Sequence, residues 1–106
     1  MVKVFIIPEG KSQADEIIEF LLRGKYLLTA MIIENYIEAK IDVKNQTSRS
    51  KKTVVSGIIR SLQFNNLNDR LREIYHSNMP ILYSIPIIQM DPIQSDAIAD
   101  YITVFE

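Results

Sequence analysis

The side chains that could carry out chemistry are few in this chain of 106 residues. There is one histidine, His76, and no cysteine, which excludes disulfides, thiolate nucleophiles and cysteine-ligated metal centres. An imidazole is a good ligand for copper or zinc, but tight binding needs three or four converging ligands. His76 also follows a predicted helix, where a positive imidazole would complement the helix dipole. The residue types therefore leave two interpretations of His76 open, a metal ligand or a partly exposed helix terminus.

Three other side chains are weaker candidates for holding a cation. Glu34 and Glu38 fall on one parity of a predicted strand, where such pairs either bind a cation or form a solvated face. Met31 is a soft thioether that would suit Cu(I), although a methionine at this place is expected to be core. Catalysis is not expected, because His76 has no partner recognisable in the sequence and no serine lies in a nucleophile motif.

A basic segment, KNQTSRSKK, runs from Lys44 to Lys52 without an apolar residue. It is predicted to be a loop between two strands. Its cationic residues could attract a phosphate group or an acidic protein partner, or could be a solvated hairpin tip. These residues are Lys44, Arg49, Lys51 and Lys52. Binding of ATP through a glycine-rich loop is not expected, because the three glycines are scattered along the chain.

Composition limits the possible classes of protein. With 47% hydrophobic residues, 24% charged residues and a formal net charge of -1, the chain is expected to be one domain, 1–106, without affinity for nucleic acid or membranes. The apolar run Val4–Ile7 is too short for a secretory signal and is predicted to be a strand. We therefore expect a cytoplasmic protein.

The hydrophobic pattern predicts the elements that position these side chains. Strands are expected over Val2–Ile7, Leu27–Val43, Thr53–Leu62 and Ile81–Ile88. Helices are expected over 12–24, 66–77 and 95–105, with N-caps at Ser12, Asn66 and Ser95 and a left-handed C-terminal cap at Gly24. In the second strand, Ile33, Ile37 and Ile41 share one parity, which predicts one packed and one solvated face from Ile33 onward.

This order of elements, βαββαβ plus a terminal helix, defines an α+β, ferredoxin-like antiparallel sheet with both main helices on one face. The first and third strands carry apolar residues on both parities, yet no element of the chain is left to cover the second face. Another subunit is the simplest cover. Pro80 and Pro86 bracket the fourth strand and indicate a short strand at the edge of the sheet.

Four stretches resemble the CutA-like divalent-cation tolerance family, within the larger group of PII-like trimers. They are VKVFIIPEGKSQADEIIEFLLRGK, LLTAMII, TVVSGIIRS and HSNMPILYSIPI, and the resemblance extends from Val2 to about Tyr101. The family usually has a cysteine near the position of Met31, and an aromatic, glycine-rich hairpin where this chain has IEAKIDVKNQTSRSKK.

The resemblance implies a non-enzymatic homotrimer concerned with divalent-cation tolerance. It implies that His76 is the residue most associated with copper or another divalent ion, with Met31 and Glu34 as further candidates and binding expected between subunits. The alternative that it implies is a PII-like regulatory module. In that module the 44–52 loop would contact a protein partner, and a small ligand would bind in the cleft between subunits.

Overall fold

The computed structural model describes residues 1–102, and the predicted fold class is confirmed over this range. The strands are β1 (Val2–Ile7), β2 (Met31–Ile41), β3 (Thr47–Ile59) and β4 (Ile81–Pro86). The α-helices are α1 (Lys11–Arg23), α2 (Phe64–Tyr75) and α3 (Pro92–Tyr101), with short 3₁₀ turns at Ser61–Gln63 and His76–Asn78. None of the helices in this range is long and apolar enough to cross a membrane.

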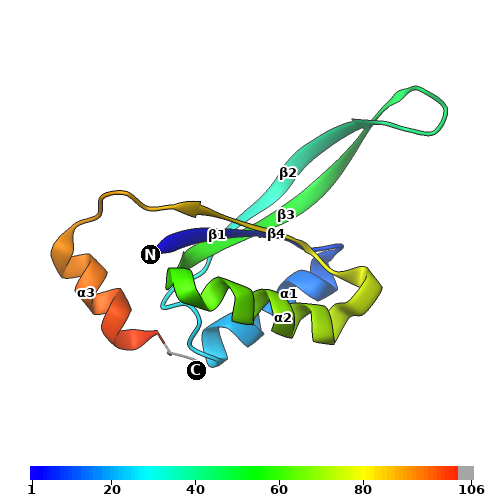
Figure 1. Cartoon of the computed structure of the whole chain (residues 1–106). Coiled ribbons are helices and arrows are strands. Elements are labelled where there is room, and N and C mark those ends of the chain that lie inside the picture. The colour runs from blue at the N-terminus through cyan, green and yellow to red at the C-terminus, as the bar shows by residue number, and fades with distance from the viewer. Residues whose placement is uncertain (103–106) are drawn as a thin grey trace.

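The four strands form one antiparallel sheet in the order β2-β3-β1-β4. Helices α1 and α2 lie on the same side of this sheet, and α3 stands apart at the end opposite the β2–β3 hairpin (Figure 1). The hairpin extends well past the other elements, which gives the molecule an extent of 50 × 29 × 20 Å. As expected, β4 is an edge strand, with Pro80 directly before it and Pro86 at its end.

The hydrophobic core lies between the sheet and the two main helices. Alternation along the strands turns Val4 and Ile6 of β1, with Val55 and Ile59 of β3, toward the helices. The helices contribute the i, i+4 pairs Ile17 and Leu21 of α1, and Leu67 and Leu71 of α2. Leu27, in the segment that leads from α1 to β2, completes this core and is fully buried.

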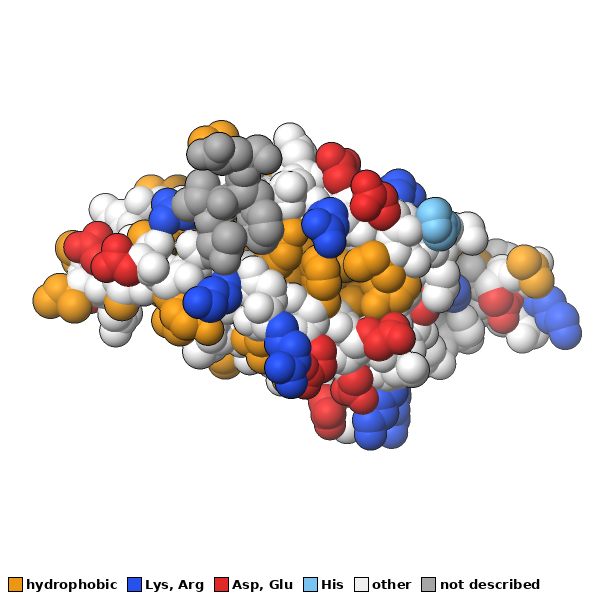
Figure 2. Space-filling model, turned by 90° about the horizontal axis from the view of Figure 1, so that it is seen from below, with side chains coloured by type: hydrophobic (Ala, Val, Ile, Leu, Met, Phe, Trp, Pro, Cys, Tyr) orange, Lys and Arg blue, Asp and Glu red, His pale blue; other side chains and the backbone are white. Residues whose placement is uncertain are grey.

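The other sheet face, which we call the open face, has no helical layer over it. By strand pairing it carries residues from all four strands. Those with large apolar side chains are Phe5, Ile7, Met31, Ile33, Tyr36, Ile58, Ile81, Tyr83 and Ile85, together with Val54, which is buried among its neighbours. On the helix side, acidic and basic side chains surround the apolar areas (Figure 2). The open face therefore has the character of a surface that another chain would cover.

Strand β2 departs from the sequence prediction in length, exposure and phase. It begins at Met31 rather than Leu27, and nearly all of its residues are exposed, so neither its start nor one of its faces is packed within the chain. A bulge interrupts its pairing with β3, since Ile33 pairs with Val54 but Tyr36 pairs with Lys52. The extra residue places Ile33 and Ile37 on opposite faces. The predicted shared face of Ile33, Ile37 and Ile41 is therefore wrong.

The predicted 44–52 loop is mostly strand. Strand β3 begins at Thr47, so only 42–46 connects β2 to β3. The Asp42 carboxylate accepts hydrogen bonds from the backbone N–H groups of Lys44 and Gln46, at 2.9 and 3.0 Å, and Asn45 adopts a positive φ of 61°. Such turns suit Asp and Asn, whose side chains bond to nearby backbone and tolerate the left-handed region. Of the four cationic loop residues, Lys44 alone lies in the turn.

The helix ends also differ from prediction. Helices α1 and α2 begin at Lys11 and Phe64 without a side-chain cap, so Ser12 and Asn66 are not N-caps. Leu62 lies in a 3₁₀ turn rather than in the third strand. Helix α3 is capped by Asp91, whose side chain accepts from the Gln94 N–H, and not by Ser95. Residues 103–105 of that predicted helix lie outside the described residues.

Gly24 is the C-cap of α1, as predicted, but the left-handed residue lies one position beyond it. Gly24 has an ordinary φ of -77°, and Lys25 takes the left-handed conformation with a φ of 57°. The N–H of Tyr26 donates to the Leu21 carbonyl and the N–H of Lys25 to the Leu22 carbonyl. This is the double hydrogen bond of a Schellman motif.

Candidate functional site

His76 lies at the C-terminal end of α2, where the sequence placed it. Its backbone N–H donates to the Arg72 carbonyl, its φ is 50° and its side chain is exposed. Within residues 1–102, no three His, Cys, Asp or Glu side chains are grouped so that they could hold a metal ion. A single copy of the described chain therefore presents His76 as one accessible imidazole and supplies no complete set of ligands.

The environment of His76 includes a hydrogen bond between α2 and α1. The hydroxyl of Tyr75, the preceding residue, donates to Glu16 Oε2 at 3.2 Å. Partial burial raises the pKa of Tyr75, and the hydrogen bond and negative charge of Glu16 raise it further. The phenol is therefore neutral at physiological pH and is a poor metal ligand in that form.

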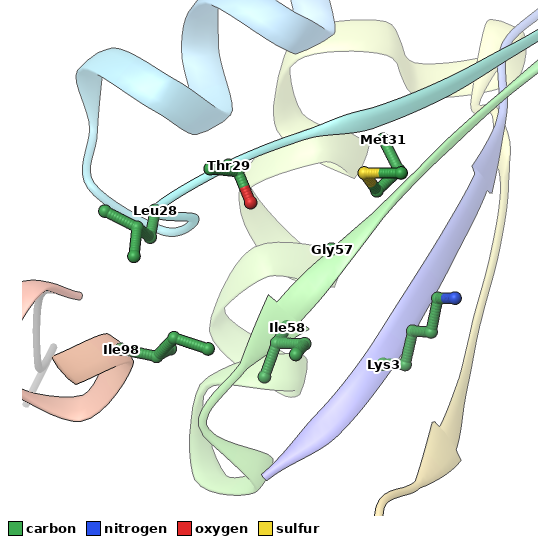
Figure 3. A pocket seen from close by; sticks show the side chains of 7 residues that line it. All are labelled: Lys3, Leu28, Thr29, Met31, Gly57, Ile58 and Ile98. Atoms are coloured by element: carbon green, nitrogen blue, oxygen red, sulfur yellow. The ribbon is translucent and has the colours of Figure 1, made fainter. Parts of the chain in front are cut away.

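Met31 is not in the core, and that expectation is wrong for the single chain. It is the first residue of β2, with 62% of its surface exposed, and its side chain lies on the open face. It lines a cavity of about 260 Å³. The other lining residues are Lys3, Leu28, Thr29, Gly57, Ile58 and Ile98, which come from β1, β3, α3 and the segment before β2 (Figure 3).

Glu34 lies in the β2 bulge. Because Ile33 faces the open side, the next residue turns toward the helix side, whereas Glu38 pairs with Ser50 on the open side. The two carboxylates that were expected to share a face are therefore on opposite faces. Glu34 lines a second pocket, of about 240 Å³, together with Lys11 and Lys51. His76 lines neither of these two pockets, so the three metal candidates occupy separate places on one subunit.

The residues that were expected to form a partner-binding loop lie on different parts of the hairpin. Lys44 is exposed at the tip, and Arg49, Lys51 and Lys52 lie along β3. Alternation along the strand directs Lys51 to the helix side and Lys52, opposite Tyr36, to the open side. The bulge at Glu34 and the position of Lys11 near Lys51 were not foreseen. Asn35, a residue type depleted in strands, was the one indication of the bulge.

These observations define a class of protein: a ferredoxin-like α+β domain with one open apolar sheet face and a projecting hairpin. No family model matches the chain, and no curated protein sequence matches it. Solved structures, in contrast, match the chain in fold. Over 97% of this chain and 100% of the other, it superposes on the CutA protein of Pyrococcus horikoshii with a TM-score of 0.82 at 14% identity.

Two further neighbours extend this likeness to other organisms. The divalent ion tolerance protein CutA1 of Ehrlichia chaffeensis gives a TM-score of 0.82 at 12% identity, covering 97% of this chain and 95% of the other. CutA1 of Oryza sativa gives 0.81 at 9% identity, covering 96% and 93%. The chain therefore has the fold of the CutA divalent cation tolerance proteins over nearly its whole length, with strongly diverged residues.

Proposed function

We propose that this protein is a non-enzymatic CutA-like homotrimer that binds a divalent cation, copper in the first place, between its subunits. The observation that carries the proposal is the match of the fold, over 97% of the chain, to CutA proteins, of which that of Ehrlichia chaffeensis is named for divalent ion tolerance. The open face supports the oligomer, because a soluble monomer rarely exposes so many neighbouring apolar side chains.

His76 is the side chain that we assign to the cation. It is exposed, so it can meet groups from a neighbouring subunit, and imidazole binds Cu²⁺ well. The described part of one chain lacks a set of ligands grouped around it, so the remaining ligands must come from a second subunit or from water. Met31 and Glu34 are secondary candidates, and each would need a ligand from another subunit, since the chain itself keeps them apart.

Calorimetric titration of Cu²⁺ into the tag-free protein tests this assignment. Saturable binding to the wild type, lost in His76→Ala, is the expected result. His76→Asn should be titrated beside it, because asparagine tolerates the positive φ of this position while lacking the imidazole. Equal binding by the wild type and both variants would show that His76 is not a ligand.

A PII-like regulatory module is the second candidate function. The observation that favours it is the projecting hairpin, whose tip exposes Val43 and Lys44 far from the body of the domain. This function predicts that neutralising Lys51 and Lys52 abolishes binding of a partner or ligand, whereas His76→Ala has no effect. The two functions are therefore separated by the same pair of variants.

A further inference from the structure

The pocket beside Glu34 lies where the hairpin leaves the body of the domain and α1 begins. It has a volume of about 240 Å³. Its lining residues come from the first residue of α1, the bulge of β2 and the facing part of β3: Lys11, Glu34, Asn35, Lys51, Lys52 and Thr53. Three of these six residues are lysines, in a chain whose formal net charge is -1. With three lysines against Glu34, the lining has a local excess of positive charge.

The bulge gives the pocket its shape. Between the pairs Ile33–Val54 and Tyr36–Lys52, two residues of β2 lie opposite Thr53 alone. Asn35 takes a φ of 59°, a conformation that an asparagine accepts more readily than most residues. Bulges bend a strand and redirect its side chains, and they are common next to functional sites. Alternation after Ile33 turns Glu34 toward the helix side, where Lys11 and Lys51 also lie, and the bulge adds Asn35 beside it in the pocket wall.

The charged side chains of this pocket form no close ion pairs among the described residues. Among residues 1–102, Arg23 and Glu19 form the ion pair, and none of the three lysines or Glu34 has an ion-pair partner within 4.0 Å. Lys11 also begins a 13-residue helix that has no acidic residue in its first turn and no side-chain cap. The helix dipole adds positive potential at that point, but the lysines supply the full charges.

We propose that this pocket binds a small multivalent anion that carries phosphate or carboxylate groups. Lys11 and Lys51, which both lie on the helix side, would provide the principal ammonium contacts, and the Asn35 amide and Thr53 hydroxyl are polar donors in the same wall. Lys52, whose side chain alternates toward the open side, would contribute less. The negative charge of Glu34 would weaken the interaction. This site requires neither His76 nor a bound metal.

Titration calorimetry with pyrophosphate, on metal-free protein near physiological ionic strength, tests the proposal. The double variant Lys11→Gln/Lys51→Gln removes the two principal cations. Lys40→Gln/Lys44→Gln is the matched control, because it removes the same charge from exposed hairpin residues outside the pocket. We expect the affinity for pyrophosphate to fall about tenfold or more in the first variant and less than about twofold in the control, as for lost charge-assisted hydrogen bonds.

A third variant should change the affinity for pyrophosphate in the opposite direction. Glu34→Gln should tighten pyrophosphate binding by about two- to fivefold, because it removes a negative charge beside the lysines. Citrate in place of pyrophosphate then distinguishes a site for phosphate groups from one that also accepts carboxylates. Thermal unfolding without anion should be unchanged in all variants, since the substituted side chains are exposed. Absent binding, or equal weakening in the pocket and control variants, would overturn the proposal, whatever the outcome of the copper titration.

Discussion

Leu27 occupies the space that a side chain at Gly57 would need: both of its terminal methyl carbons lie 2.6 Å from the position of a Cβ on that glycine. A glycine inside a strand often marks a bulge or a close approach, and Gly57 marks a close approach, since it pairs regularly with Val4 of β1. Leu27 is fully buried, so it cannot move aside without disturbing the core. The absence of a side chain at Gly57 thus allows the segment before β2 to dock on β3.

Gly57→Ala should destabilise the protein by about 1 to 3 kcal/mol, the usual cost of overpacking a core. Chemical denaturation measures this change. Gly10→Ala is the control, because nothing lies within 4 Å of a Cβ there and its φ of -172° is ordinary extended backbone. We expect it to cost less than about 1 kcal/mol. Equal effects at the two glycines would contradict the packing described for Leu27.

Tyr26 connects the end of α1 to α2, since its buried hydroxyl donates to Asn66 Oδ1 at 2.8 Å. Tyr26→Phe should cost about 1 kcal/mol of unfolding free energy. Burial raises the pKa of Tyr26 above its ordinary value of 10.0, and the positive charge of Arg70 counters this only in part.

The folded protein therefore holds the Tyr26 proton to a higher pH than the unfolded chain does. Its contribution to stability is complete below pH 10 and is lost as the pH rises through the folded-state pKa. We expect the stability advantage of the wild type over Tyr26→Phe to shrink above pH 10 in denaturation series. An advantage that grows with pH would contradict this sign.

The backbone of His76 predicts a reversal of the usual order of glycine and alanine. With φ at 50° and ψ at -118°, this position suits glycine, so His76→Gly should be about 1 kcal/mol more stable than His76→Ala. Asp69, exposed inside α2, should show the opposite order, with Asp69→Ala more stable than Asp69→Gly by about 1 kcal/mol. Chemical denaturation of these four variants tests the prediction. The same order of glycine and alanine stability at both positions would refute it.

If the proposed homotrimer is built on the open face, the structure predicts which surface substitution dissociates it. Ile33, on the open face, and Ile74, on α2, are exposed to similar extents, 47% and 49%. Ile33→Lys should dissociate the assembly, because it buries an unpaired charge at the interface, whereas Ile74→Lys should leave it intact. Sedimentation velocity measures both variants. Dissociation by Ile74→Lys alone would place the interface on the helix side instead.

The sequence predicted the parts of this fold that depend on hydrophobic periodicity. Strand β1 and the buried sides of α1 and α2 follow their hydrophobic patterns, although Ile74, at helical spacing from Leu67 and Leu71, is half exposed. The phase of β2 could not be predicted, because a bulge at Asn35 shifts every later side chain and leaves the composition unchanged. The polar run 47–52 reads as a loop, but it pairs with β2 as a strand.

The candidate site was harder to predict for a related reason. The sequence predicts that His76 lies at the end of a helix. It does not predict that Lys11 lies near Glu34 and Lys51, because this proximity depends on how the hairpin leaves the sheet. Met31 was expected in the core because apolar side chains are commonly buried, and its exposure agrees with the proposal that a second subunit covers the open face. Local sequence patterns do not show which distant segments, or which subunits, come into contact.

The measurement that tests the central claim most directly is the molar mass of the tag-free wild-type protein at micromolar concentration, by light scattering coupled to size-exclusion chromatography. A homotrimer built on the open face predicts three times the chain mass of 12.2 kDa. A stable monomer of 12.2 kDa would contradict it, because the open face would then have no cover and His76 no neighbouring subunit to complete a cation site.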